Sequence, residues 1–94
     1  MSALQLSDFE GAVGETWDVD LGAGTAVGLR LDKAQPLARA LREEGGFRLE
    51  WTGPSDTFLP QATYRFRRGA AQFEMFIVPV AKDGADYRYE AIFN

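Results

Sequence analysis

Two aspartates stand where a pair of carboxylates could do chemistry. Asp18 and Asp20 lie two residues apart in an alternating segment, so their carboxylates would project from one strand face at a spacing of about 7 Å. Such a pair can bind calcium or share acid and base work. A calcium loop needs a third oxygen ligand two residues further on, where this chain has Gly22. We therefore interpret the pair as a solvated, charged strand face.

The residue types behind most enzyme chemistry are missing, because the chain has no histidine and no cysteine. This removes the commonest general base, the thiolate nucleophile, the usual zinc ligands and every disulfide. An enzyme that used only carboxylates would need two of them facing each other across a cleft. The sequence thus predicts no catalytic residue, no metal site and no cofactor.

Three arginines, Arg65, Arg67 and Arg68, cluster on the polar side of a predicted strand and its turn. Their guanidinium groups could bind phosphate or a carboxylate-rich partner. Glu74 lies across the predicted hairpin, however, and cross-strand ion pairs are the commoner use of such residues. The net charge of −4, with five acids and no base in residues 1–29, also argues against a nucleic-acid partner.

Alternation of apolar and polar residues with a period of two predicts six strands. We expect them near residues 17–21, 27–31, 47–51, 63–67, 73–80 and 87–93. Ser7 and Glu10 have the spacing of a capping box, which predicts a short helix from Asp8 to Val13. A run of helix formers indicates another short helix near residues 37–44.

The length of 94 residues is typical of one domain, so we expect a single β domain over residues 1–94. Six strands with short connections favour an all-β fold, either a six-stranded antiparallel small barrel or a sandwich. The lack of cysteine fits a reducing compartment, and no apolar run approaches the length of a membrane span. We therefore expect a cytoplasmic protein without membrane contact.

The fifth predicted strand is apolar on both of its faces between Met75 and Val80. A sheet with one wet face does not tolerate this pattern, so something must cover each side. Three covers are open: a bulge near Phe76, the helix over residues 8–13, or a second subunit. Pro79 cannot donate to a strand ladder, which predicts an edge or a bulge at that end.

Several stretches together carry a resemblance to a known family. They are Leu6–Glu10 with Gly14–Thr16, Trp51–Pro54, Leu59–Gln61 with Thr63–Arg65, and Phe76–Val80 with Tyr89–Asn94. With them the chain resembles, over nearly its whole length, a family of small single-domain bacterial proteins of unknown function. The V-P-V strand with the terminal Y-E-A-x-F-N is the most specific part. The resemblance implies genes near phage-tail-like collar or fibre proteins, and hence an accessory or assembly role without known catalytic residues.

These observations predict a non-enzymatic module that binds another protein, tail-like or fibre-like in kind, or a second copy of itself as a homodimer. Phe76, Val78 and Val80 would make the contact, with Arg65 and Arg67 as the polar rim. The alternative is a small-ligand-binding β-barrel whose aromatic interior leaves a cavity.

Overall fold

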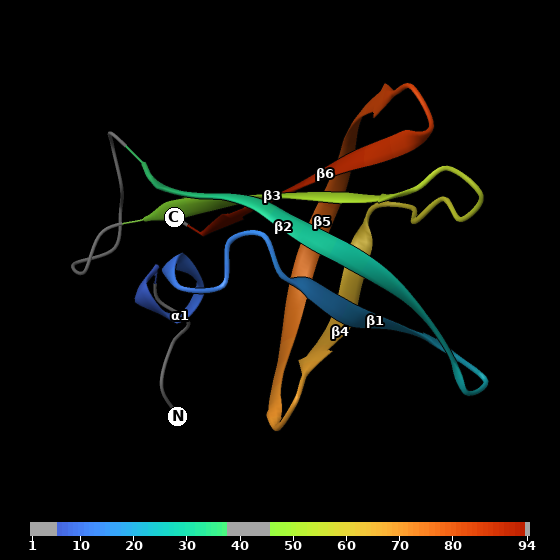
Figure 1. The fold of residues 1–94 in the computed structure, drawn as a ribbon, viewed down its shortest axis with the longest axis horizontal. Coiled ribbons are helices and arrows are strands. Elements are labelled where there is room, and N and C mark those ends of the chain that lie inside the picture. Colours follow the sequence, from blue (N-terminus) through green and yellow to red (C-terminus); the bar gives the residue numbers. More distant parts are fainter. Residues whose placement is uncertain (1–5, 38–45, 94) are drawn as a thin grey trace.

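The computed structural model describes residues 6–37 and 46–93, which form a closed barrel of six antiparallel strands with one short helix (Figure 1). Its elements are α1 (Ser7–Glu10), β1 (Thr16–Gly22), β2 (Thr25–Pro36), β3 (Phe47–Pro54), β4 (Ala62–Arg68), β5 (Ala71–Asp83) and β6 (Asp86–Phe93). The all-β class predicted from alternation is confirmed, and the architecture is the barrel. The helix predicted near residues 37–44 falls almost wholly outside the described residues.

The barrel consists of two three-stranded meanders, because the strand order around it is β1-β2-β3-β6-β5-β4. β3 and β6 join the meanders along one side through eight residue pairs. β1 and β4 join them along the other side through two pairs, Asp18 with Arg67 and Val19 with Phe66. The pattern of pairing is unchanged when the two meanders are exchanged, so β2 and β5 occupy equivalent places.

The two middle strands are the longest, with 12 residues in β2 and 13 in β5. Each pairs with one neighbour in its first half and with another in its second half. Each also has a register shift in the second half, at Asp32 in β2 and at Val80 in β5. Such bulges bend a strand and turn successive side chains to the same side. The bulge predicted as one option near Phe76 thus lies four residues further on, directly after Pro79.

Aromatic rings fill the interior, and α1 closes one end of the barrel near the end of β6 (Figure 1). Phe9 is fully buried, with its ring centroid 6.0 Å from that of Trp17, 6.0 Å from that of Phe47 and 5.6 Å from that of Phe73. The helix therefore plugs the barrel and does not cover the outer face of β5, which was one of the predicted covers.

The predicted capping box is absent, because Ser7 lies inside α1. Leu6 is the N-cap, and no side chain caps the helix. The helix also ends earlier than predicted, at Glu10, and Val13 is 46% exposed where Ala12 is buried. A single turn is not stable by itself, so we infer that the burial of Phe9 holds it in place. Within residues 6–37 and 46–93, no helix has the length and apolar character of a membrane span.

The loop between β3 and β4 is bound to the barrel by hydrogen bonds. The backbone N–H of Leu59 donates to the buried Tyr89 hydroxyl at 3.0 Å, and the Tyr64 hydroxyl donates to the carbonyl of Pro60 at 2.7 Å. Because Leu59 is itself buried, this loop extends the core beyond the strands.

The third strand is longer than predicted, since β3 continues through the turn-rich residues to Pro54. Gly53 occupies an inward position there, opposite Tyr87 on β6. A Cβ at this position would lie 2.4 Å from Cδ2 of Leu29 and 3.3 Å from Cε2 of Tyr89. Glycine is therefore required by packing at this point and does not mark the end of the strand.

Removing the plug should destabilise the whole barrel. Phe9→Ala leaves a cavity among three aromatic rings, so we expect the free energy of unfolding to fall by about 3–5 kcal/mol. Val13→Ala, at an exposed site three residues beyond α1, should change it by less than about 0.5 kcal/mol. Urea unfolding followed by tryptophan fluorescence measures both. Equal effects of the two variants would show that α1 does not close the core.

Candidate functional site

The apolar residues predicted to make contact lie together on β5. Phe76 is 50% exposed and Val80 is 48% exposed, whereas Val78 between them is half-buried. Val78 pairs with Glu90 of β6, so Ile92, two residues further on, shares this outer face and is 48% exposed. We call Phe76, Val78, Val80 and Ile92 the β5 patch. Ile92 was missed, although it follows Arg88 and Glu90 at a position where alternation calls for a polar residue.

The two predicted rim arginines lie on β4, beside β5. Arg65 is opposite Glu74 and contacts its carboxylate at 3.8 Å, while both side chains remain at least half exposed. Arg67 donates from Nε and Nη2 to the Asp20 carboxylate of β1, at 2.9 and 2.6 Å. Thr63, next to Arg65 on this face, is opposite Phe76. The arginines and the apolar residues thus occupy one continuous face.

The remaining charged candidates form ion pairs across the β1–β4 side. Arg68 pairs with Glu15, and its guanidinium carbon lies 5.8 Å from the centre of the Trp17 ring. Asp20 forms an ion pair with Arg67, and Asp18 is exposed opposite the same arginine. This arrangement agrees with the interpretation of the aspartates as a charged strand face. In residues 6–37 and 46–93, no cluster of acids suited to hold a metal ion occurs.

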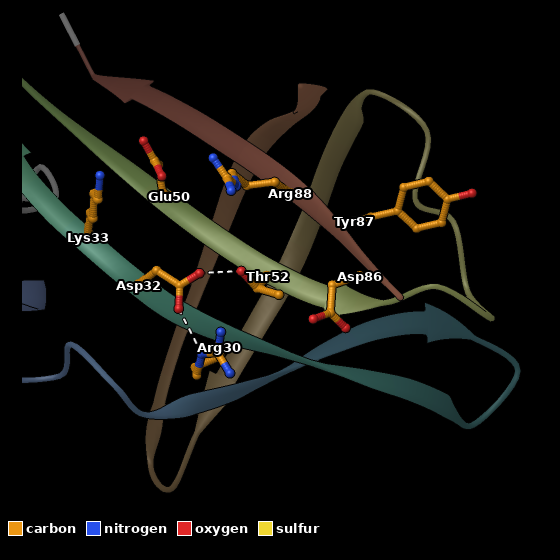
Figure 2. A pocket seen from close by; sticks show the side chains of 8 residues that line it. All are labelled: Arg30, Asp32, Lys33, Glu50, Thr52, Asp86, Tyr87 and Arg88. Carbon is orange, nitrogen blue, oxygen red and sulfur yellow. Dashed lines mark hydrogen bonds and ion pairs between the residues drawn. The ribbon is translucent and has the colours of Figure 1, made fainter. Parts of the chain in front are cut away.

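A charged pocket of about 220 Å³ lies across the β3–β6 junction of the two meanders, over β2, β3 and β6 (Figure 2). Three cations and three anions line it together with Thr52 and Tyr87. They are Arg30, Lys33 and Arg88, and Asp32, Glu50 and Asp86. The charges balance, so the pocket has no net attraction for an ion of either sign.

Asp32 lies at the centre of this pocket, at the bulge of β2. Its carboxylate accepts hydrogen bonds from Nε of Arg30, at 2.7 Å, and from the hydroxyl of Thr52 (Figure 2). Burial alone would raise the pKa of Asp32, but the hydrogen bonds from Arg30 and Thr52 and the charges of Arg30 and Arg88 outweigh it. The pKa of Asp32 therefore lies below its ordinary value. A carboxylate held in this state is a poor general acid or base near neutral pH.

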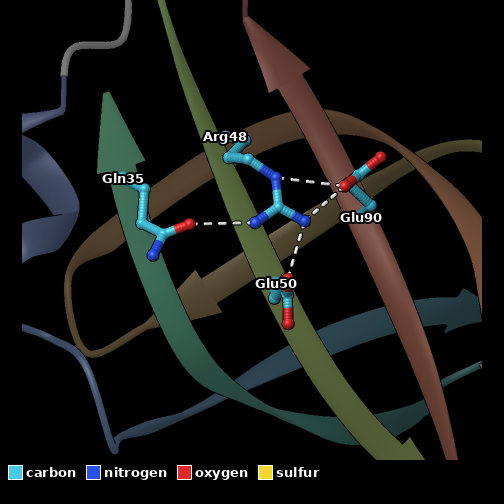
Figure 3. Close-up of polar contacts among 4 residues, drawn as sticks. All are labelled: Gln35, Arg48, Glu50 and Glu90. Carbon is cyan, nitrogen blue, oxygen red and sulfur yellow. Dashed lines mark hydrogen bonds and ion pairs between the residues drawn. The ribbon is translucent and has the colours of Figure 1, made fainter. Parts of the chain in front are cut away.

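A second polar cluster adjoins the pocket and is centred on Arg48 (Figure 3). Glu50 and Glu90 stand directly opposite each other on β3 and β6, which would repel. Arg48 donates from Nη2 to Glu50 at 2.6 Å and to Glu90 at 2.5 Å, and from Nε to Glu90 at 3.1 Å. Its Nη1 donates to Gln35 of β2 at 3.0 Å. One guanidinium thus joins three strands and neutralises the repulsion.

Sequence reasoning did not find the pocket or the Arg48 cluster. Both depend on β3 lying between β2 and β6, and strand order is not visible in the alternation. The available signal was weak: Arg48, Glu50 and Thr52 follow one another on the polar side of one strand.

The fold and its surfaces define a class: a small antiparallel β-barrel with an apolar interior and with its charged side chains on the outside. No charged residue is buried within the described ranges. A family model, described as a domain of unknown function (DUF6916), matches residues 4–93, and the chain belongs to this family. This agrees with the resemblance to a small family of unknown function. No curated protein and no solved structure matches the chain.

The low pKa of Asp32 predicts a pH-dependent contribution to stability. A carboxylate whose folded pKa is depressed stabilises the protein above its unfolded pKa of about 3.9, and the effect is lost as the pH falls through the folded value. Asp32→Asn should therefore lower the free energy of unfolding by about 0.5–1.5 kcal/mol at neutral pH. The difference from the unmodified protein should shrink below about pH 4.

Urea unfolding at several pH values tests this prediction, with Asp18→Asn as the control for the change in net charge. A difference between Asp32→Asn and the unmodified protein that stays constant with pH would contradict the assigned role of the carboxylate.

Proposed function

We propose that this domain is a non-enzymatic protein-binding or assembly module that docks through the β5 patch. The observation that carries the proposal is the exposure of large apolar side chains on β5 up to its bulge, whereas the equivalent bulge of β2 is charged. At the bulge of β2 the outward residues are Asp32 and Lys33, whereas at that of β5 they are Val80 and Ala81. Apolar side chains at such a place gain free energy only when a partner covers them.

The surroundings of the patch suit a protein interface. Arg65 lies on one side of it, and Arg48, opposite Ile92 in the β3–β6 pairing, lies on the other. An apolar centre bordered by arginines is the composition typical of protein interfaces. Four apolar side chains form a small centre, which favours a regulated or multi-subunit contact over an obligate dimer.

The chemistry of the chain supports binding over catalysis. Histidine and cysteine are missing from the sequence, and Asp32, the carboxylate at the centre of the charged pocket, is already paired. The resemblance described above points to the kind of partner. We propose that the partner belongs to a phage-tail-like or surface-fibre assembly.

Substitution of Phe76 tests the proposal, because the chain offers a matched control. Phe58 is 51% exposed and lies in the β3–β4 loop, where its ring meets that of Tyr87. We expect Phe76→Ser to weaken partner binding by about tenfold or more, as truncation of an interface centre does. Phe58→Ser should leave binding within about twofold, and both variants should remain folded.

Differential capture from the native host, quantified by mass spectrometry, identifies proteins retained by the unmodified domain and by Phe58→Ser but lost with Phe76→Ser. Calorimetry with the purified partner then measures the affinities. Light scattering that showed a dimer, dissociated only by Phe76→Ser, would make a second copy the partner. A monomer whose captured proteins are the same for both variants would contradict the proposal.

A second candidate function, a small-ligand-binding barrel, is favoured by one observation. The indole N–H groups of Trp17 and Trp51 are buried without a hydrogen-bond acceptor. A small polar molecule between them would satisfy both donors. The two rings lie edge to face with centroids 6.1 Å apart in a packed aromatic core, which leaves little room for one. Native mass spectrometry of the purified protein would reveal such a ligand by its added mass.

A further inference from the structure

The barrel is incompletely closed along one side. β1 and β4 have seven residues each, yet their pairing covers only Asp18 with Arg67 and Val19 with Phe66. Beyond Val19, β1 continues to Gly22 paired with β2 alone, with a register shift between Asp20 and Gly22, and Ala62–Arg65 of β4 are paired with β5 alone. Strands at an edge present backbone donors and acceptors that can pair with another chain. We call this stretch the open β1–β4 edge.

A hollow of about 570 Å³ lies at this edge, next to the β1–β2 hairpin. The hairpin extends to the lower right in Figure 1. Its lining combines hairpin residues with outward residues of β4 and β5. These are Asp20, Gly22, Gly24, Thr25, Arg65, Arg67 and Glu74. Two of the hairpin residues are glycines, so a chain could approach the backbone closely from this side. The volume lies within the range of ligand-binding sites in proteins.

The ion pair along the edge is diagonal and does not join the residues that a continued ladder would place opposite each other. If the β1–β4 ladder continued, Asp20 would stand opposite Arg65. Asp20 instead binds Arg67 through two hydrogen bonds. In the described part of the chain, the ion pair that Arg65 keeps is the 3.8 Å contact with Glu74 on its other side. On its β1 side, the Arg65 guanidinium thus lacks the carboxylate that Asp20 would supply in a continued ladder.

We propose that the open β1–β4 edge accepts an extended segment of a partner protein as an added strand along β4. An acidic side chain of that segment faces Arg65, and apolar side chains alternate with it, as in the Asp18-Val19-Asp20 pattern of β1 itself. Backbone hydrogen bonds provide most of the affinity in this mode, and the side chains select the sequence. The site shares Arg65 with the border of the β5 patch but contains none of the patch residues, and it does not depend on that patch binding anything.

Amide hydrogen exchange of the intact protein tests whether the edge is open. Alternate amides within Ala62–Arg65, those that point toward β1, should exchange much faster than the amides of the β3–β6 ladder. Protection of all four equal to that ladder would mean that the edge is closed, and would overturn the proposal.

Binding is tested with a capped heptapeptide of alternating valine and aspartate, titrated into the labelled protein and followed by amide chemical shifts. We expect shifts and slowed exchange at Ala62–Arg65. Two versions N-methylated on opposite edges of the peptide should differ about tenfold in affinity, because only one edge pairs with β4. Equal binding of the two versions would mean capture by side chains only, and no binding at about 1 mM would also overturn the proposal.

Three variants separate the contributions of Arg65, of its competitor Glu74 and of the β5 patch to peptide binding. Arg65→Gln should weaken the aspartate peptide about fivefold or more, and a lysine version of the peptide should not bind. Glu74→Gln should strengthen binding severalfold, since Glu74 competes for Arg65. Phe76→Ser should leave the peptide affinity within about twofold while weakening the partner contact of the β5 patch. Failure of one proposal is therefore distinguishable from failure of the other.

Discussion

Closure of this barrel depends on two strands, β2 and β5, that each leave one neighbour and join another halfway along. A regular strand cannot turn this corner without losing register, and an extra residue gives it the bend. The same extra residue turns two successive side chains outward. In β2 these are Asp32 and Lys33, and in β5 they are Val80 and Ala81. One geometric requirement thus contributes Asp32 and Lys33 to the charged pocket and Val80 to the exposed apolar patch.

The two outer faces differ in whether their side chains already have interaction partners within the domain. On the charged face, Arg48 already donates hydrogen bonds to Glu50 and Glu90. Asp32 already accepts hydrogen bonds from Arg30 and Thr52. A partner there would have to replace hydrogen bonds that exist, with little net gain. The β5 patch has no internal alternative, because an apolar side chain leaves water only by being covered. Docking is therefore favoured on the second meander.

The sequence predicted what depends on alternation and missed what depends on neighbours. The inward positions Tyr87, Tyr89, Ala91 and Phe93 follow from a period of two, and the six strands with them. Pro79 predicted an edge or a bulge at its end of the strand, and the bulge lies directly after it, at Val80. The corner that the strand turns there could not be derived, because it depends on the neighbouring strands. The third strand was predicted to end at residue 51, before Gly53, because the crowding by Leu29 and Tyr89 arises only in the packed core.

The candidate site divides in the same way. Phe76, Val78 and Val80 were recognisable as a set because they break the alternation along a single strand. The Arg48 cluster was not, because its members come from β2, β3 and β6, which are side by side only in the closed barrel. The pattern within one strand reveals residues that break its alternation. An ion-pair network between strands can be predicted only when the order of the strands is known.

The open β1–β4 edge has its origin in the turn of the first hairpin. Gly22, Ala23 and Gly24 all have positive φ, at 86°, 54° and 77°. For Ala23 this conformation costs about 1–2 kcal/mol, so the hairpin must hold it in place. Turns of this kind match the twist of the two strands that they join, and β1 stays paired with β2 up to Gly22, with a register shift between Asp20 and Gly22. β1 then follows β2 and not β4, and the edge of β4 stays open because of the hairpin geometry and not because of any residue of β4.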